Sequence, residues 1–112
     1  MSIDGEAATH DALRGVAGAH AAALAALRAL RDAGVPVSAN TQINRRSAPE
    51  LPAILETVIA HGAHSWQLQL TVAMGRAADD PALLLQPYEL LEVFRTIEAL
   101  AARCREADVV LW

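Results

Sequence analysis

The sequence predicts an α/β fold in which parallel strands alternate with helices, and three observations support this prediction. First, segments with helical spacing of apolar residues alternate along the chain with segments in which every second residue is apolar. Second, this helix–strand–helix–strand order is typical of right-handed parallel βαβ crossovers. Third, 112 residues with 54% hydrophobic and 20% charged side chains suit one packed domain spanning residues 1–112.

The first helix and strand are predicted in the first half of the chain. Residues 19–33 are rich in alanine, carry leucines at helical spacing and are followed by Gly34, a residue that commonly ends helices. Residues 35–44 then alternate, with one mostly apolar face and one face of Ser, Asn and Gln. We therefore expect a helix over 19–33 and a strand over 35–44.

A second helix and strand follow. Ser47 and Glu50 have the spacing of a capping box, and the apolar stripe over 51–59 predicts a helix that ends at Gly62. Residues 65–72 alternate again between apolar and polar side chains. This alternation predicts a second strand.

The last part of the chain is expected to hold a long connection, a third helix and a strand. The connection covers 73–86, and Pro87 opens a helix that runs to about residue 107. Its expected buried stripe consists of Leu90, Phe94, Ile97, Ala101 and Cys104. Residues 109–112 begin another strand, and residues 2–5 form the tail of an earlier one.

The polar faces of the strands narrow the architecture. Central strands of a doubly wound sheet are covered on both faces and are apolar throughout, whereas these strands keep one face of Ser, Asn, Gln and Thr. A barrel with helices only on its outside and a polar, ligand-filled interior fits better. Three helices and at most four strands are too few to close a barrel of about eight such units. We therefore expect a parallel βαβαβα arc, with a further β, of an incomplete barrel.

Charge and cysteine content exclude several function classes. The net charge of −4 argues against a nucleic-acid partner. The uncharged stretch over 15–27 is too short to span a membrane, and the acidic residues Asp4 and Glu6 stand where an export signal needs positive charge, which predicts a cytoplasmic protein. The single cysteine, Cys104, cannot form an internal disulfide or hold zinc or an iron–sulfur cluster by itself.

Candidate ligand-binding residues lie at the carboxyl ends of the predicted strands, where parallel α/β folds bind ligands. They are mostly neutral hydrogen-bonding groups, suited to a ligand with hydroxyls, amides and ring nitrogens. The set comprises Ser2, Asp4, Gly5, Asn40, Gln42, Asn44, Arg45, Arg46, Gln69, Thr71, Met74, Gly75 and Arg76. Ser2 and Asp4 could instead form a turn or cap in a frayed N-terminus, and Asn40 and Gln42 could be solvated edge-strand residues.

Histidine patterns in the sequence favour structural roles. His61 and His64 have the spacing of a metal-binding pair, but they fall at a helix end opposite the expected ligand site, so solvated or capping side chains are favoured. His10 beside Asp11 could serve acid–base chemistry, but no nucleophile accompanies it and a loop hydrogen bond is favoured. Cys104 is expected to be a small core residue.

Four segments in order carry a family resemblance. They are Ser2-Ile3-Asp4-Gly5, then Thr9-His10-Asp11-Ala12-Leu13-Arg14-Gly15, then residues 30–37 leading to Asn40-Thr41, and finally Met74-Gly75-Arg76-Ala77 followed by Leu85-Gln86-Pro87-Tyr88. This series resembles the middle of a radical S-adenosylmethionine (radical SAM) enzyme. It is similar to the branch whose members often carry an extra C-terminal cluster domain of the SPASM type and modify peptides.

The resemblance implies a partial TIM-like barrel and an oxidoreductase that uses two cofactors. In the family a 4Fe–4S cluster reductively cleaves S-adenosylmethionine to a 5′-deoxyadenosyl radical, which would modify a peptide or another small substrate. The implied contacts are Ser2 and Asp4 with the ribose and methionyl portion, Asn40 with the same ligand, Met74 and Gly75 with the adenine, and Arg14 with the carboxylate.

The sequence departs from the family at its cluster. The CxxxCxxC loop and the glycine-rich strand end that hold the cluster and the methionine amine are absent, so we expect the chain alone to be inactive. Met1 stands where the family has an aliphatic strand residue, so we expect that it is not the ancestral start and that a CxxxCxxC loop is encoded about 80–100 residues upstream, about three βα units of usual size.

Two other classes remain open on the sequence alone. One is a non-catalytic interaction module of α/β type that self-associates through its unfinished strand edges. The other is a small nucleotide-binding α/β domain that binds adenosine-containing ligands without iron.

Overall fold

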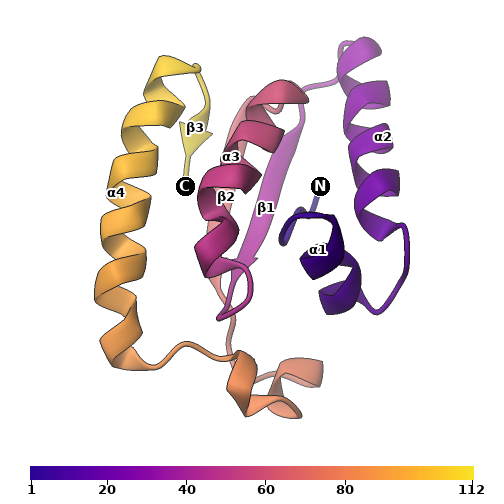
Figure 1. Cartoon of the computed structure of the whole chain (residues 1–112). Coiled ribbons are helices and arrows are strands. Elements are labelled where there is room, and N and C mark those ends of the chain that lie inside the picture. Colours follow the sequence, from indigo (N-terminus) through magenta and orange to yellow (C-terminus); the bar gives the residue numbers. More distant parts are fainter.

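The structure is a computed structural model that describes residues 1–112, apart from the side chain of Arg76. It contains a three-stranded parallel sheet and four α-helices (Figure 1). The strands, in the sheet order β1-β2-β3, are β1 (Ser38–Ile43), β2 (Ser65–Leu70) and β3 (Val110–Leu111). The helices are α1 (Ala7–Arg14), α2 (Ala19–Asp32), α3 (Leu51–Ala60) and α4 (Leu90–Glu106).

Both strand pairs are parallel, as the sequence predicts. β1 pairs with β2 over its whole length, from Ser38 opposite Ser65 to Ile43 opposite Leu70. β3 pairs with the start of β2. The N-terminal segment adds a single parallel bridge between Ser2 and Asn40, so both expected strand tails pair with the sheet.

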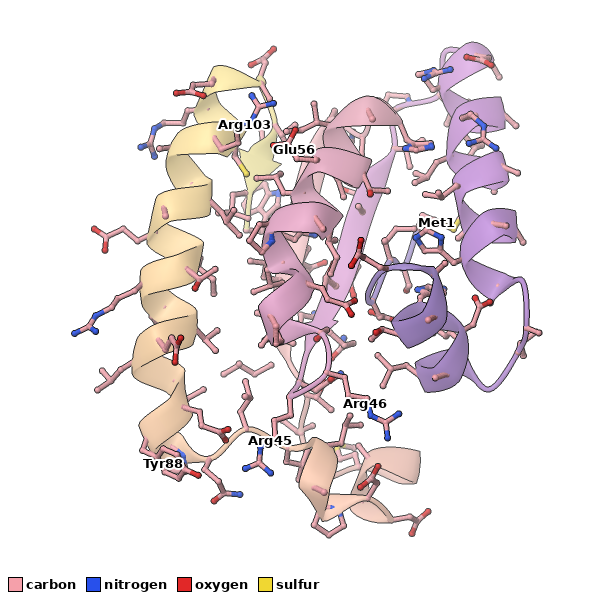
Figure 2. All side chains as sticks on the ribbon, viewed as in Figure 1. Met1, Arg45, Arg46, Glu56, Tyr88 and Arg103 are labelled. Atoms are coloured by element: carbon pink, nitrogen blue, oxygen red, sulfur yellow. The ribbon has the colours of Figure 1, made fainter. Side chains whose placement is uncertain are left out.

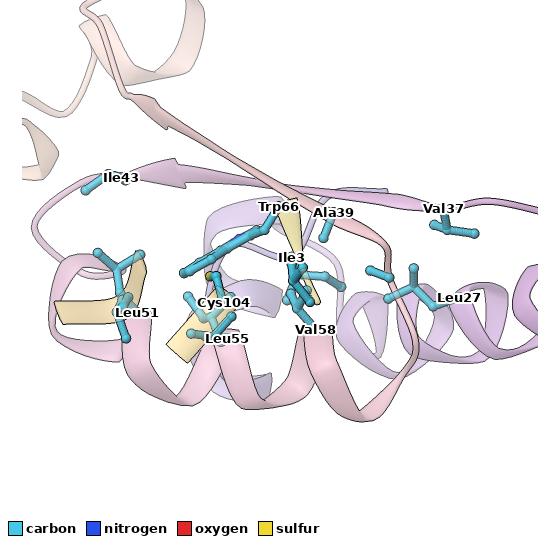
Figure 3. Close-up of a cluster of buried hydrophobic side chains, with 14 of the residues drawn as sticks. Ile3, Leu27, Val37, Ala39, Ile43, Leu51, Leu55, Val58, Trp66 and Cys104 are labelled. Carbon is cyan, nitrogen blue, oxygen red and sulfur yellow. The ribbon is translucent and has the colours of Figure 1, made fainter. Parts of the chain in front are cut away.

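The two faces of β1 differ in burial as the alternation predicts, whereas on β2 the expected apolar face is buried at Trp66 but Leu70 is 41% exposed, and Val72 beyond the strand is 60% exposed. Ala39, Thr41 and Ile43 of β1 and Trp66 of β2 are buried, and the core side chains fill the space between the strands and the helices (Figure 3). The opposite rows carry amides that bond across the strands. Asn40 Nδ2 donates to Gln67 Oε1 at 3.3 Å, and Gln42 Nε2 donates to Gln69 Oε1 at 2.7 Å.

Helix α1 was not expected from the sequence. Residues 7–14 lack a regular apolar stripe, and His10 is the buried residue of the helix. Its N-terminus is held from far along the chain, because the Glu50 carboxylate accepts hydrogen bonds from the Glu6 amide at 2.7 Å and from Thr9 Oγ1 at 2.6 Å. This tertiary contact, together with the left-handed Gly15 at the C-terminus and packing against α2, stabilises the helix.

The expected capping box at Ser47 and Glu50 is wrong. Ser47 Oγ accepts a hydrogen bond from the backbone amide of Asn44 at 2.9 Å and donates one to the backbone carbonyl of Gln42 at 2.7 Å. It thus closes the turn after β1, while Glu50 bonds to α1. The chain enters α3 through the short 3₁₀ helix η1 (Ala48–Glu50).

The expected buried stripe of the third helix is partly wrong. The buried residues of α4 are Val93, Leu100 and Cys104, whereas Phe94 is 53% exposed. The helix is preceded by η4 (Pro87–Glu89) and is rotated so that Arg103 forms a two-point contact with Glu56 of α3, at 2.8 and 3.0 Å (Figure 2). Two neighbouring faces of α4 are apolar, and packing against α3 and β3 selects between them.

Candidate functional site

A pocket of about 400 Å³ lies where β1, β2 and the N-terminal segment end. Its volume falls within the range of about 300–1,000 Å³ of small-molecule sites. The polar side chains that line it are Asp4, Arg14, Gln42, Asn44, Arg46, Thr71 and Asp80. Ala12, Leu13, Met74, Ala77 and Leu83 supply its apolar wall. A pocket therefore lies at the carboxyl edge of the parallel sheet, the edge at which such sheets bind ligands.

Asp4 forms the inner corner of this pocket and is 4% exposed. Its Oδ1 accepts a hydrogen bond from the backbone amide of Gln42 at 2.9 Å, and its Oδ2 pairs with Arg14. In a regular parallel ladder the backbone amide of Gln42 would bond to the Ile3 carbonyl. Here that carbonyl accepts from Thr41 Oγ1 at 2.6 Å, so the Asp4 side chain ends the strand pairing.

The backbone of Asp4 is held by a buried histidine. The Asp4 amide donates to Nδ1 of His10 at 2.9 Å, and His10 is 2% exposed. Burial lowers the pKa of His10. The expected loop hydrogen bond of His10 is therefore present, although it starts from a helix.

The exit of β1 is closed by Asn44. Its Oδ1 accepts from the amides of Arg46 at 2.9 Å and Ser47 at 3.1 Å, which forms an Asx turn. Arg46 and Asp80 face each other at 4.0 Å across the lining of the pocket. This ion pair joins the end of β1 to the loop that follows β2.

Arg45 fixes the loop after β2. Its guanidinium binds both carboxylate oxygens of Glu89 and also donates to the Ala82 carbonyl at 3.2 Å, and this contact lowers the pKa of the Glu89 carboxyl. In Figure 2, Arg45 and Arg46 lie beside this loop, where η2 (Gly75–Ala78) and η3 (Pro81–Leu83) are found. The loop that carries Leu83 is therefore anchored to the segment that follows β1.

Thr71 carries an unpartnered hydroxyl. Its amide continues the sheet by donating to the Ile43 carbonyl at 2.9 Å. Its Oγ1 is buried and has no hydrogen-bond partner in the described part of the chain. Buried hydroxyls are nearly always bonded, so the hydrogen-bonding capacity of this atom is left open at the pocket.

The expected ligand-contact residues are distributed over two levels of the sheet. Asp4, Arg14 and Met74 line the pocket. Ser2 and Asn40 pair with each other one step back along the strands, and Gly75 opens η2 with a φ of +56°. The side chain of Arg76 lies outside the described residues.

Some lining residues were missed by sequence reasoning. Leu13, Asp80 and Leu83 come from α1 and from the long connection, and the strand-end rule gives no signal for such segments. A signal for Asp80 was available only in its place before Pro81, which marks a turn.

Within the described residues, no group of three His, Cys, Asp or Glu side chains could hold a metal ion. His61 bonds to the Thr57 carbonyl at 2.8 Å and to Arg28 at 3.1 Å, and His64 bonds to the Val37 carbonyl at 2.6 Å. Cys104 is buried in the core, and burial raises the pKa of its thiol. No described helix is both long and apolar enough to cross a bilayer.

Comparison with known proteins identifies relatives of the chain. It is 38% identical over 92 residues to the AdoMet-dependent heme synthase of Nitratidesulfovibrio vulgaris, and the match covers 80% of this chain and 25% of that protein. It is 31% identical over 116 residues to the pre-heme d1 synthase of Dinoroseobacter shibae, a match that covers 98% of this chain and 28% of that protein. It is 33% identical over 79 residues to the sporulation killing factor maturation protein SkfB of Bacillus subtilis, a match that covers 70% of this chain and 19% of that protein. The chain is a relative of radical SAM enzymes. No family model matches it.

The radical SAM relationship covers a part of those proteins, since the chain spans about a quarter of the length of the curated relatives that it matches. The relationship implies S-adenosylmethionine and a 4Fe–4S cluster as cofactors. With one cysteine in the sequence, the cluster ligands are not in this chain.

Proposed function

We propose that residues 1–112 form an arc of a radical SAM barrel domain whose carboxyl edge helps to bind S-adenosylmethionine. The observation that carries this proposal is the convergence of Asp4, Arg14, Asn44 and Thr71 on one pocket at the ends of parallel strands. The polar amide rows on the sheet face opposite the core suit the interior of such an arc. The parent enzyme would modify a peptide or another small substrate by radical chemistry.

The residues of the pocket fit S-adenosylmethionine. This ligand offers hydroxyls, a carboxylate, an amine and ring nitrogens, and the pocket offers a guanidinium, carboxamides and the unpartnered Thr71 hydroxyl. Arg14 would face the carboxylate, and Asp4, with lone pairs beyond its two bonds, would face the ribose and methionyl portion together with Ser2. Asn40 would face the same ligand, and the backbone at Met74 and Gly75 would lie beside the adenine.

The 4Fe–4S cluster does not fit the described residues. Cys104 is buried on α4, and iron–sulfur clusters require several thiolates. The cluster would have to be held by residues outside these 112, so the chain alone would be inactive. When both are bound, the cluster and S-adenosylmethionine supply the radical chemistry of the family.

The proposal is tested by substituting Thr71 with valine and titrating S-adenosylmethionine by calorimetry. Because Thr71 Oγ1 has no protein partner in the described part of the chain, Thr71→Val should fold with unchanged or higher stability. It should bind the ligand about 2- to 12-fold more weakly, the range that corresponds to one hydrogen bond of about 0.5–1.5 kcal/mol.

Thr96→Val is the matched control, because Thr96 Oγ1 bonds to the Glu92 carbonyl within α4, away from the lining of this pocket. It should leave affinity unchanged. Equal affinity of Thr71→Val and wild type would remove Thr71 from the site. The absence of any binding by the wild-type chain would contradict its proposed part in holding S-adenosylmethionine.

Self-association is a second candidate, favoured by exposed apolar side chains in β3 and directly after it. Val110 is 51% exposed and Trp112 is 74% exposed. β3 is also an edge strand of the three-stranded sheet, and open edges pair with other chains. Sedimentation velocity over a wide concentration range should show dimers if this candidate holds, and a monomer throughout would contradict it.

A further inference from the structure

We propose that His10 is a positioning residue for the Asp4–Arg14 pair, and that it holds Asp4 in place only while its imidazole is neutral. Binding of S-adenosylmethionine at the pocket should therefore weaken when His10 takes up a proton. For its ligand, this inference rests on the proposed function. The positioning itself rests on contacts within the chain.

The first support is the direction of one hydrogen bond. The Asp4 amide is the donor at 2.9 Å, so Nδ1 of His10 must carry a lone pair and the ring proton of the neutral form must be on Nε2. An imidazolium ion carries protons on both nitrogens and cannot accept this bond. Protonation would therefore leave the Asp4 amide, in a nearly fully buried residue, without its acceptor.

The second support is the place of this bond in the site. Asp4 lies where the N-terminal segment leaves β1, and its carboxylate is held by the Gln42 amide and Arg14. His10 supplies the contact to the Asp4 main chain from α1. Loss of that contact frees the peptide before Asp4 to rotate, which moves the carboxylate and the guanidinium that line the pocket.

The charged groups around His10 decide when it titrates. The carboxylates of Asp4 and Asp11 favour the imidazolium, whereas Arg14 and His20 oppose it, and His20 meets the His10 ring edge-on with centroids 5.5 Å apart. Burial is the largest influence and lowers the pKa of His10. The ring is therefore neutral at neutral pH, and the loss of binding should occur below the ordinary pKa of histidine, about 6.5.

A purely structural histidine would give a different result in a substitution series. His10→Asn introduces a carboxamide whose Oδ1 can occupy the place of Nδ1 and accept the same bond without a titrating ring, so this variant separates positioning from charge. His10→Leu removes the acceptor. His20→Asn is the matched control, because it removes the neighbouring ring but leaves the bond to Asp4.

The test measures the affinity of the 112-residue chain for S-adenosylmethionine between about pH 5 and pH 8 by calorimetry. Wild type should lose about tenfold in affinity toward the acid end, the size expected for one buried hydrogen bond. His10→Asn should bind within about threefold of the wild-type value at neutral pH and show no such decline, His10→Leu should be about tenfold weaker throughout, and His20→Asn should keep the decline. A wild-type pH profile in His10→Asn, or wild-type affinity in His10→Leu, would overturn the inference.

A second measurement keeps this inference separate from the proposed function. In ¹⁵N-labelled chain, an N–H···N hydrogen bond gives a scalar coupling between the Asp4 amide nitrogen and Nδ1 of His10, which should vanish as the ring protonates. If wild type binds no S-adenosylmethionine, the proposed function fails, and the positioning role is then decided by this coupling and by whether the Arg14 side-chain resonances shift in the same titration. The absence of the coupling at neutral pH, or unmoved Arg14 resonances, would refute the role of His10.

Discussion

The Thr41 hydroxyl makes two buried hydrogen bonds, and its removal should cost more stability than its small size suggests. Thr41 Oγ1 donates to the Ile3 carbonyl at 2.6 Å and accepts from Nε1 of Trp66 at 2.9 Å. Thr41 and Trp66 are completely buried, so water cannot replace a lost partner of the indole N–H. Thr41→Val has nearly the same shape but removes the partner of both the carbonyl and the indole.

The magnitude follows from the two orphaned groups. Each buried donor or acceptor that loses its partner costs about 1–3 kcal/mol, so Thr41→Val should lose about 2–6 kcal/mol out of the about 5–15 kcal/mol typical of a small domain. Thr41→Ser keeps the hydroxyl and loses one buried methyl group, which costs about 1 kcal/mol. Urea unfolding followed by circular dichroism should therefore rank wild type above Thr41→Ser and Thr41→Val last. If Thr41→Val proved as stable as Thr41→Ser, burial of apolar area would dominate and the two hydrogen bonds of Thr41 would contribute nothing to the free energy of unfolding.

Two further predictions concern the segment that holds α1 and α2. The Asp11 carboxylate accepts hydrogen bonds from the backbone amides of His20 at 2.8 Å and Gly18 at 2.7 Å, and these bonds, with that from His20 the larger influence, lower the pKa of Asp11. The stability that they give is present above the ordinary pKa of aspartate and is lost as the pH falls through the lower pKa of the folded state. Acid unfolding of wild type should therefore show this pH-dependent loss of stability, and acid unfolding of Asp11→Asn should lack it. Gly5→Ala would place a methyl group 2.7 Å from Thr9 Cγ2 and 2.8 Å from Glu50 Oε2. This crowding should lower the free energy of unfolding, measured by urea denaturation, by about 1–3 kcal/mol. A second substitution, Thr9→Ser, should recover part of the loss, and an unchanged urea denaturation curve for Gly5→Ala would contradict the close approach.

Local periodicity was sufficient to place the helix over 19–33, which is α2, and the two strands. It gave the buried face of β1 correctly, whereas on β2 the expected apolar face is buried at Trp66 but exposed at Leu70, and Val72 beyond the strand is also exposed. The strand-end rule then found Gln42, Asn44 and Thr71, because parallel strands bring their carboxyl ends to one edge.

Long-range contacts account for what the sequence did not show. Helix α1 depends on Glu50, which lies 44 positions from Glu6 and 41 positions from Thr9, the two residues that it binds. The rotation of α4 depends on its contact with Glu56 and on the packing of β3. Asp80 and Leu83 reach the pocket because Arg45 anchors their loop, and no periodic signal in the sequence records such an ion pair.

The Asp4 carboxylate lies both at the end of a strand pairing and in the lining of the pocket. One oxygen takes the place of a main-chain carbonyl in the ladder with Gln42, and the other orients Arg14. Substitution of Asp4 would therefore disturb strand pairing and the pocket lining together. Thr71 differs, because no described protein group bonds to its hydroxyl, so we expect its removal to leave the strand pairing unchanged. Asp4 and Thr71 therefore differ within one pocket, since the carboxylate makes two contacts and the hydroxyl makes none in the described part of the chain.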